Sequence, residues 1–316
     1  MSDPGGWTNP DQPRSDLPPA PPPPAPGPGR GYGKPGVIPL RPLSVGEILD
    51  GAVQTMRRHP ALVFGVSAVV AVVSGALEFA ASYWLLSGLP EPSQLGAAAT
   101  QEEQMRFLYD STGRLAASGG VTVVISLLIR TFLAGFITVV VGRAVLGRPV
   151  TLREGIAELR PRFLPLVGLT VLVTIIVAVA TVFLIIPGIW MWAMLSLAAP
   201  ALVLERGGIR ESLKRSWRLV SGTWWRVFGV LLLAAIAATI ISMVIEIPFG
   251  VGIGVGSGST ADLSVGNQLL STLGGVVAET LVGPFTAAAT ALLYIDQRMR
   301  KEGMDIQLAR SAGAAQ

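Results

Sequence analysis

Apolar residues in this chain gather into six long runs, a spacing unlike that of a soluble core. The hydrocarbon core of a bilayer is about 30 Å thick and requires roughly 20 apolar residues per helix. Each run approaches or exceeds that length, so the pattern predicts an all-α, polytopic membrane protein. The six predicted transmembrane helices are residues 61–87, 119–146, 164–186, 188–205, 225–248 and 267–294.

Three shorter segments place apolar and charged residues on opposite faces of a helix: PLSVGEILDGAVQTMRRHP, PVTLREGIAELRPRF and RGGIRESLKRSWRLVSG. Each predicts an amphipathic helix directly before the first, third or fifth span. Ser44 with Glu47, and Thr151 with Glu154, have the spacing of capping boxes, whereas the third segment keeps only Glu211. We therefore expect three cytoplasmic interfacial helices, each followed by a transmembrane hairpin.

The distribution of positive charge predicts the orientation. With the N-terminus inside, the cytoplasmic segments carry 21 of the 24 Lys and Arg residues, and this excess marks the cytoplasmic side. Both termini are therefore expected in the cytoplasm. Interfacial aromatic residues are assigned on the same basis. They are Tyr83, Trp84, Trp190 and Trp192 at the outer surface, beside a turn at Pro187 and Gly188, and Trp217, Trp224, Trp225 and Tyr294 at the inner surface.

Composition limits the chemistry. The chain is 51% hydrophobic and 14% charged, has no cysteine, and contains one histidine, His59. Thiolate or His-rich metal sites and a Cys/His nucleophile pair are therefore excluded, and a serine triad would have to recruit His59 beside Pro60. We expect no catalytic residue, no metal site and no cofactor. The net charge of +4 reflects the cytoplasmic excess, so nucleic-acid binding is not expected.

The chain divides into a membrane domain and two tails. Residues 1–38 contain DLPPAPPPPAPGPGRGYGKPG, which is too poor in apolar residues to form a packed core, and are predicted to be a disordered cytoplasmic tail. Residues 39–310 form the predicted membrane domain, and residues 311–316 are predicted to be disordered.

Four charged residues fall inside the predicted spans. Arg130 lies in VVISLLIRTFLAGFITVVV, about 18 Å from the inner end of its helix, and Glu279 lies at a similar depth of about 22 Å. Glu78 and Glu246 lie nearer the outer surface and are expected to extend toward water. A lone Arg near the bilayer centre costs at least about 2.5 kcal/mol, so we predict an Arg130–Glu279 pair between the second and sixth spans. It could be a packing pair, a head-group or anion site, or part of a transport path.

Basic residues of the amphipathic helices are candidates for contact with anionic head groups, since each cation near the surface contributes about 1 kcal/mol. Alternatively, they only anchor the hairpins and set topology. The candidates are Arg57, Arg58, Arg160, Arg162, Lys214, Arg215 and Arg218.

Several segments resemble one known family. IPLRPLSVGEILDGAVQTMRRHP, VVGRAVLGRPVTLREG, LSLAAPALVLERGGIRESLKRSWRLVSGTWWRV and TALLYIDQRMRKEGMDIQLA are similar to the membrane domain named after glycerophosphoryl diester phosphodiesterases, in its actinobacterial form, over residues 38–310. That name comes from proteins that also carry a catalytic barrel, for which this chain lacks the residues, so no catalytic residue transfers. The resemblance implies a membrane module of the bacterial cell membrane, associated with lipid or envelope processes.

These observations lead to two functional hypotheses. The first is a non-enzymatic membrane module that binds lipid, with anionic lipid expected, or scaffolds an unidentified protein partner. The second is a small transporter for a polar or anionic solute, which would require helices broken by Pro or Gly near the midplane. Pro200 and Gly275 are the candidates for such breaks.

Overall fold

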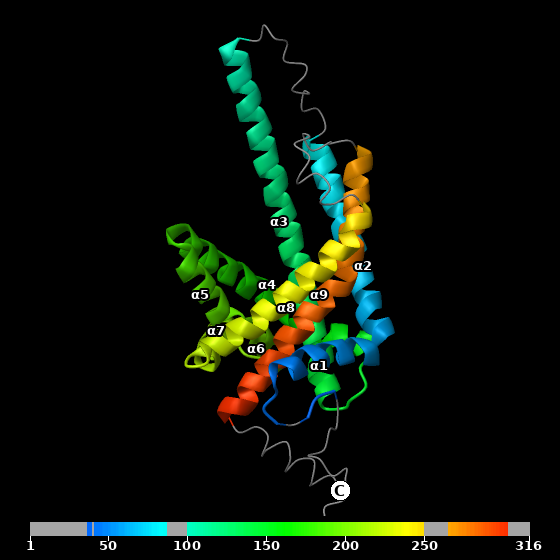
Figure 1. The fold of residues 1–316 in the computed structure, drawn as a ribbon, viewed down its shortest axis with the longest axis vertical. Coiled ribbons are helices and arrows are strands. Elements are labelled where there is room, and N and C mark those ends of the chain that lie inside the picture. Colours follow the sequence, from blue (N-terminus) through cyan, green and yellow to red (C-terminus); the bar gives the residue numbers. More distant parts are fainter. Residues whose placement is uncertain (1–36, 40, 87–99, 250–264, 303–316) are drawn as a thin grey trace, which may run out of the picture.

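The computed structural model describes residues 37–39, 41–86, 100–249 and 265–302 (Figure 1). These residues contain helices and no strand, which confirms the all-α prediction. The elements are α1 (Val45–Arg58), α2 (Pro60–Leu86), α3 (Gln101–Val145), α4 (Leu152–Phe183), α5 (Ile185–Leu195), α6 (Ala198–Glu205), α7 (Ile209–Val220), α8 (Trp224–Glu246), the 3-10 turn η2 (Ile247–Phe249) and α9 (Val265–Glu302).

Six helical segments are long and apolar enough to cross a membrane, as the hydropathy pattern predicted. They are α2, α3, α4, the α5–α6 pair, α8 with η2, and α9. The described residues thus support a multi-pass membrane protein. α1 and α7 are short and amphipathic.

The two predicted disordered tails fall mostly outside the described residues. The exception is a correction at residues 37 and 38, because Val37 and Ile38 are buried. Ile38 lies directly over α1, where its Cγ2 atom would be 2.9 Å from a Cβ atom placed on Gly51. The packed domain therefore begins before residue 39.

The second amphipathic segment is not a separate interfacial helix, which corrects the prediction. It continues without a break into the third span as α4, even though Pro161 and Pro165 lie inside the helix. Each proline removes one backbone N–H donor, but close packing on α3 supports this stretch. Gly155 of α4 faces the ring of Phe136, and Gly135 of α3 faces leucine side chains of α4, with less than 3 Å available for a Cβ atom at either glycine.

The predicted fourth span is interrupted. α5 ends at Leu195 and α6 begins at Ala198. Pro200 then lies in the first turn of α6, where the missing N–H would have had no partner within the helix. The hydroxyl of Ser216 on α7 donates to the carbonyl of Met194 at 2.7 Å. One backbone carbonyl near the end of α5 thus has its hydrogen-bond donor on α7.

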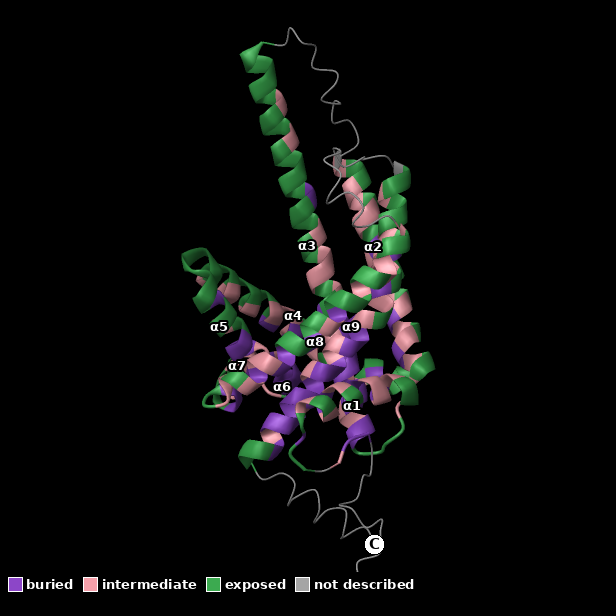
Figure 2. Cartoon of the chain, viewed as in Figure 1, coloured by how far each residue is buried: buried purple, intermediate pink, exposed green. Residues whose placement is uncertain are grey.

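The buried core occupies the end of the molecule where α1, α6 and the adjoining halves of α3 and α9 meet (Figure 2). Phe136, Leu202, Leu292 and Tyr294 are completely buried there. α3 shows the division clearly, since residues 101–130 are mostly exposed and residues 131–145 are mostly buried. The exposed apolar halves of α2, α3 and the α4–α5 hairpin are surfaces suited to lipid.

Candidate functional site

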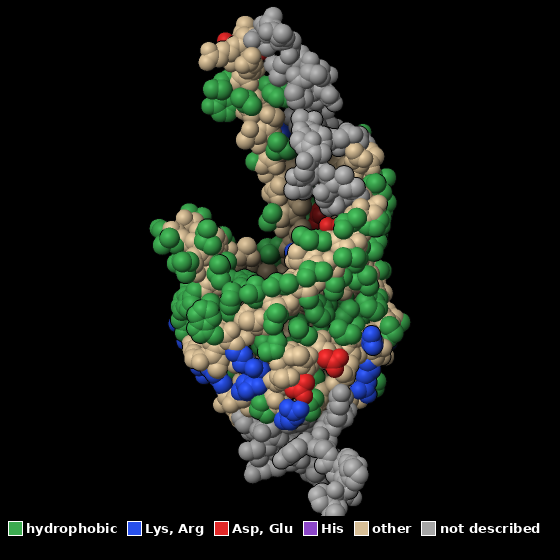
Figure 3. All heavy atoms as spheres, in the orientation of Figure 1, with side chains coloured by type: hydrophobic (Ala, Val, Ile, Leu, Met, Phe, Trp, Pro, Cys, Tyr) green, Lys and Arg blue, Asp and Glu red, His purple; other side chains and the backbone are tan. Residues whose placement is uncertain are grey.

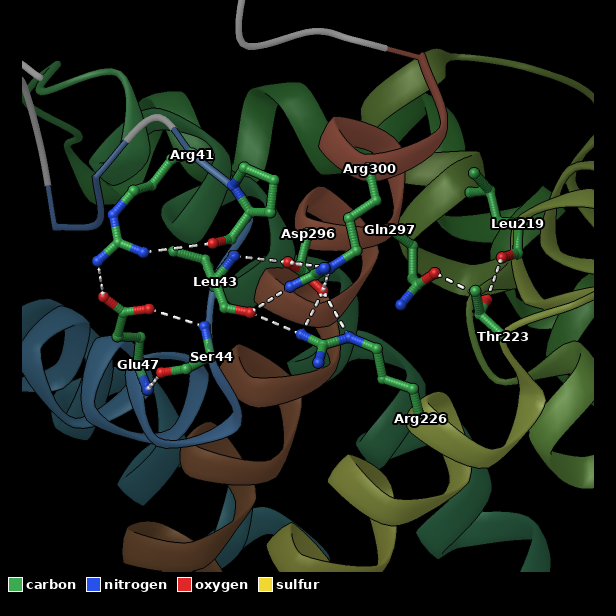
Figure 4. Close-up of polar contacts among 11 residues, drawn as sticks. Arg41, Leu43, Ser44, Glu47, Leu219, Thr223, Arg226, Asp296, Gln297 and Arg300 are labelled. Carbon is green, nitrogen blue, oxygen red and sulfur yellow. Dashed lines mark hydrogen bonds and ion pairs between the residues drawn. The ribbon is translucent and has the colours of Figure 1, made fainter.

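Asp296, near the end of α9, is the centre of a polar cluster that joins three distant parts of the chain (Figure 4). Its side chain is fully buried and accepts a hydrogen bond from the backbone N–H of Leu43 at 2.8 Å. Arg226 of α8 and Arg300 of α9 each form an ion pair with it at 3.0 Å. Both guanidinium groups also donate to the carbonyl of Leu43 at 2.6 Å. The cluster therefore ties the segment before α1 to α8 and α9.

A second charged network links α6, α7 and α9 through Arg215. Arg215 pairs with Glu205 at 2.7 Å and also contacts Glu302, while Tyr294 donates its hydroxyl to Glu205. Hydrogen bonds to Glu302 and Glu205 raise the pKa of Arg215 above its ordinary value, against the opposing effect of burial. These contacts fix which face of α7 points into the protein.

Arg162 and Arg215 were both predicted to contact head groups, and the structure places both inside the protein. The exposed fractions of their side chains are only 14% and 16%. Arg162 donates to the carbonyl of Val203 at 2.8 Å and lies 3.7 Å from Glu158. Because protein acceptors already occupy both guanidinium groups, neither is available to lipid. A helical pattern could not reveal this, since it does not show which side of a short helix meets the bundle.

The other five head-group candidates are exposed and form no ion pair with any described residue. Two lie at the end of α1, one on α4 and two on α7. They are Arg57, Arg58, Arg160, Lys214 and Arg218.

The exposed face of α7 carries a row of three cations. Arg210, Lys214 and Arg218 are four residues apart, which places neighbours about 6 Å apart along the helix. All three are exposed, whereas Ser212 and Ser216 on the opposite face are buried. Figure 3 shows Lys and Arg side chains below a broad hydrophobic belt, toward the end of the molecule where α7 lies. Arg210 was not among the predicted candidates, although its spacing from Lys214 could have revealed it.

Both predicted capping boxes are present in the geometry. The amide of Ser44 donates to Glu47 at 2.7 Å, and the amide of Glu47 donates to the Ser44 hydroxyl at 3.2 Å. The corresponding Thr151–Glu154 distances are 3.2 and 3.3 Å. At the start of α1, the hydrogen bond from the Ser44 backbone holds the pKa of Glu47 below its ordinary value. These four residues therefore determine where α1 and α4 begin.

The structure brings Arg130 and Glu279 together, with 3.8 Å between Nη2 and Oε2. The Arg130 side chain is 73% exposed, because α3 leaves the bundle at this residue. Glu78 accepts hydrogen bonds from Ser74 at 2.9 Å and from Ser126, one helical turn from Arg130, at 2.8 Å. Glu78 thus lies against α3. The contact of Arg130 with the Glu279 carboxylate favours a packing pair over an anion site.

Reversing both charges of the membrane pair should restore folding that either single reversal lowers. Arg130→Glu and Glu279→Arg each place like charges where 3.8 Å now separates opposite ones, whereas the double variant restores attraction. Residues in contact show coupling energies of about 0.5–3 kcal/mol. Folded yield from membranes measures the effect, and Arg114→Glu on the exposed part of α3 is the control. A double variant no better than the poorer single variant would contradict the pair.

One predicted outer aromatic residue, Trp190, lies beside two predicted inner ones, which is a correction. The rings of Trp190 and Trp217 are 5.4 Å apart and perpendicular, and the Trp224 indole donates to the Trp190 carbonyl at 3.3 Å. Trp192, two residues farther along α5, lies still farther from the hairpin tip. Placing Trp190 and Trp217 at opposite surfaces was wrong because hydropathy does not show how α5, α7 and α8 pack together.

A family comparison covers half of the chain. Residues 93–250 match the model described as Uncharacterised protein family (UPF0259). The chain belongs to this family. The UPF0259 match includes α3 through α8, and with them the α4–α5 hairpin and the α7 cations, but not α1, α2 or α9. No curated protein and no solved structure matches the chain.

Proposed function

We propose that this UPF0259 protein is a non-enzymatic membrane module that binds anionic lipid head groups along α7. The observation that carries the proposal is the exposed row of Arg210, Lys214 and Arg218, none of which pairs with a described carboxylate. Cations on the polar face of an interfacial helix attract anionic lipid, at about 1 kcal/mol for each residue near the surface.

The contacts behind α7 support this role because they hold the helix in one orientation. Arg215 is fixed by Glu205 and Glu302, and Ser216 is bonded to the end of α5. Trp217 is partly exposed beside the cations, and tryptophan is typical of the membrane interface. α7 thus presents its positive charges from a fixed surface. Arg57, Arg58 and Arg160 add exposed positive charge from α1 and α4.

The proposed location is the cytoplasmic leaflet of a bacterial cell membrane, with both termini inside. The excess of Lys and Arg in the connections supports this orientation, and the resemblance to the membrane domain named after glycerophosphoryl diester phosphodiesterases supports an envelope role. The absence of cysteine and the single histidine support a role without catalysis. A transporter is less well supported, because the end of α5 is packed against α7 through Ser216 and α9 is continuous through Gly275.

Neutralising the α7 row should remove most of the preference for anionic lipid. The triple variant Arg210→Gln, Lys214→Gln and Arg218→Gln loses three surface cations, or about 3 kcal/mol, which is on the order of a 100-fold loss of affinity. Native mass spectrometry of protein from mixed phosphatidylglycerol and phosphatidylethanolamine bilayers measures the retained lipid.

The control for this experiment is Arg106→Gln with Arg114→Gln, which removes exposed cations from the far half of α3. It should leave the retained phosphatidylglycerol unchanged. Equal retention of phosphatidylglycerol by the wild type and the triple variant would overturn the proposal and direct the search toward protein partners.

A further inference from the structure

α7 lies beside the base of the α4–α5 hairpin, away from its tip. On one arm, Ser216 bonds the carbonyl of Met194, close to the end of α5. On the other arm, a Cβ atom placed on Gly168 would lie 3.2 Å from the Cδ1 atom of Ile209. Because the outer face of α7 carries cations, these contacts mark where the hairpin enters the apolar layer.

Beyond α7, both arms of the hairpin are too short to cross that layer. Residues 185–194 of α5 span about 15 Å, and residues 169–183 of α4 span about 22 Å. By contrast, α8 begins beside the α5 arm, where Trp224 bonds Trp190, and its 23 residues span about 34 Å. Of these three segments, only α8 exceeds the hydrocarbon thickness of about 30 Å.

The tip of the hairpin has the composition of a segment surrounded by hydrocarbon. Its five consecutive residues are apolar, and all are 65–85% exposed. Figure 3 shows an open notch between this end of the hairpin and the upper half of α3, so no helix among the described residues covers the notch side of the tip. The tip residues are Val182, Phe183, Leu184, Ile185 and Ile186.

Part of the hydrogen bonding at the tip is internal. A single residue, Leu184, joins the two helices, and its N–H donates to Ala180 while its carbonyl accepts from Gly188. The Thr181 hydroxyl donates to the carbonyl of Val177, and Pro187 has no N–H to satisfy.

We propose that α4–α5 is a re-entrant hairpin that enters and leaves the membrane on the α7 side, with its tip packed among acyl chains inside the bilayer. Both ends of the hairpin then lie on one side, and α2, α3, α8 and α9 are the helices that cross. This proposal requires α7 to lie at the membrane boundary, but it does not depend on which lipid α7 binds.

Single cysteines can test this directly, because the chain contains none of its own. The variants are Ile186→Cys at the tip, Gln101→Cys at the start of α3 and Ser221→Cys after α7, all at exposed positions. In sealed vesicles, a membrane-impermeant maleimide should label Gln101→Cys from one side and Ser221→Cys from the other. Ile186→Cys should react at least on the order of tenfold more slowly from either side, since hydrocarbon excludes the reagent, and fully after denaturation.

The depth of the tip separates a re-entrant hairpin from one that ends just beneath the far surface. A fluorophore at Ile186→Cys should be quenched more strongly by lipids with a nitroxide at the chain end than by lipids with one near the head group. Val244→Cys, near the end of α8 and 64% exposed, should show the opposite order. If Ile186→Cys reacts like Gln101→Cys, or is quenched like Val244→Cys, the hairpin crosses the bilayer and the proposal is wrong.

Discussion

Asp296→Asn should reduce the free energy of unfolding by about 3 kcal/mol, the lower end of the range for breaking a buried ion pair from one side. Asparagine keeps the shape and can still accept the Leu43 N–H, but it removes the negative charge shared by Arg226 and Arg300. Those side chains are 28% and 31% exposed, so water relieves part of the cost. Unfolding by denaturant in detergent micelles measures the loss.

Two further variants separate charge imbalance from a general loss of packing. Glu102→Gln breaks the Arg106 pair on α3, whose side chains are 75% and 76% exposed, and it should leave stability nearly unchanged. Adding Arg300→Gln to Asp296→Asn removes one unpaired cation and should recover part of the lost stability. If Asp296→Asn is as stable as the wild type, the cluster does not stabilise the contact of the segment before α1 with α8 and α9.

Gly188→Ala should lower stability by about 1–3 kcal/mol, the usual cost of overpacking a close approach. A Cβ atom on Gly188 would lie 2.1 Å from the Oγ1 atom of Thr181 and 2.9 Å from its Cα atom. The first clash involves a side chain, but the second involves the backbone, so α5 must move away from α4. Thermal unfolding in the same micelles measures the effect.

The matched control for this substitution is Gly229→Ala in α8. A Cβ atom there meets nothing within 4 Å, so the change should stabilise the helix by up to about 1 kcal/mol through propensity alone. Combining Gly188→Ala with Thr181→Ala removes the clash with the hydroxyl but leaves the clash with the backbone of residue 181, so only partial recovery is expected. Equal effects of the two glycine substitutions would show that α4 and α5 are not closely packed.

Local sequence predicted the features that depend on neighbouring residues. Long apolar runs identified six helical segments long enough to span a membrane, one of them broken into α5 and α6. The Ser44 and Thr151 boxes were visible because capping partners are three residues apart. The proximity of Arg130 and Glu279 was predicted from depth alone, and the structure places them 3.8 Å apart. The exposure of Arg130 was not predictable, since it depends on where α3 leaves the bundle.

Features that depend on distant residues were missed. Leu43 and Asp296 are 253 positions apart, and no periodicity connects them. The misplacement of Trp190 has another cause, because hydropathy does not distinguish residues buried in protein from residues exposed to lipid. α6 is apolar because it lies in the protein core, yet it lengthens the apolar run of α5 to that of a complete span.

The length of α3 determines how far its Thr100 end lies from the rest of the protein. Its 45 residues extend about 67 Å, more than twice the hydrocarbon thickness of about 30 Å. Because α3 is one continuous helix, its length and rotation fix the position of the Thr100 end, which lies on the side opposite α7. Each residue inserted before residue 118 would raise that end by about 1.5 Å and turn it by about 100°. Seven inserted residues would therefore move the Thr100 end by about 10 Å while turning it only about 20° from its present direction.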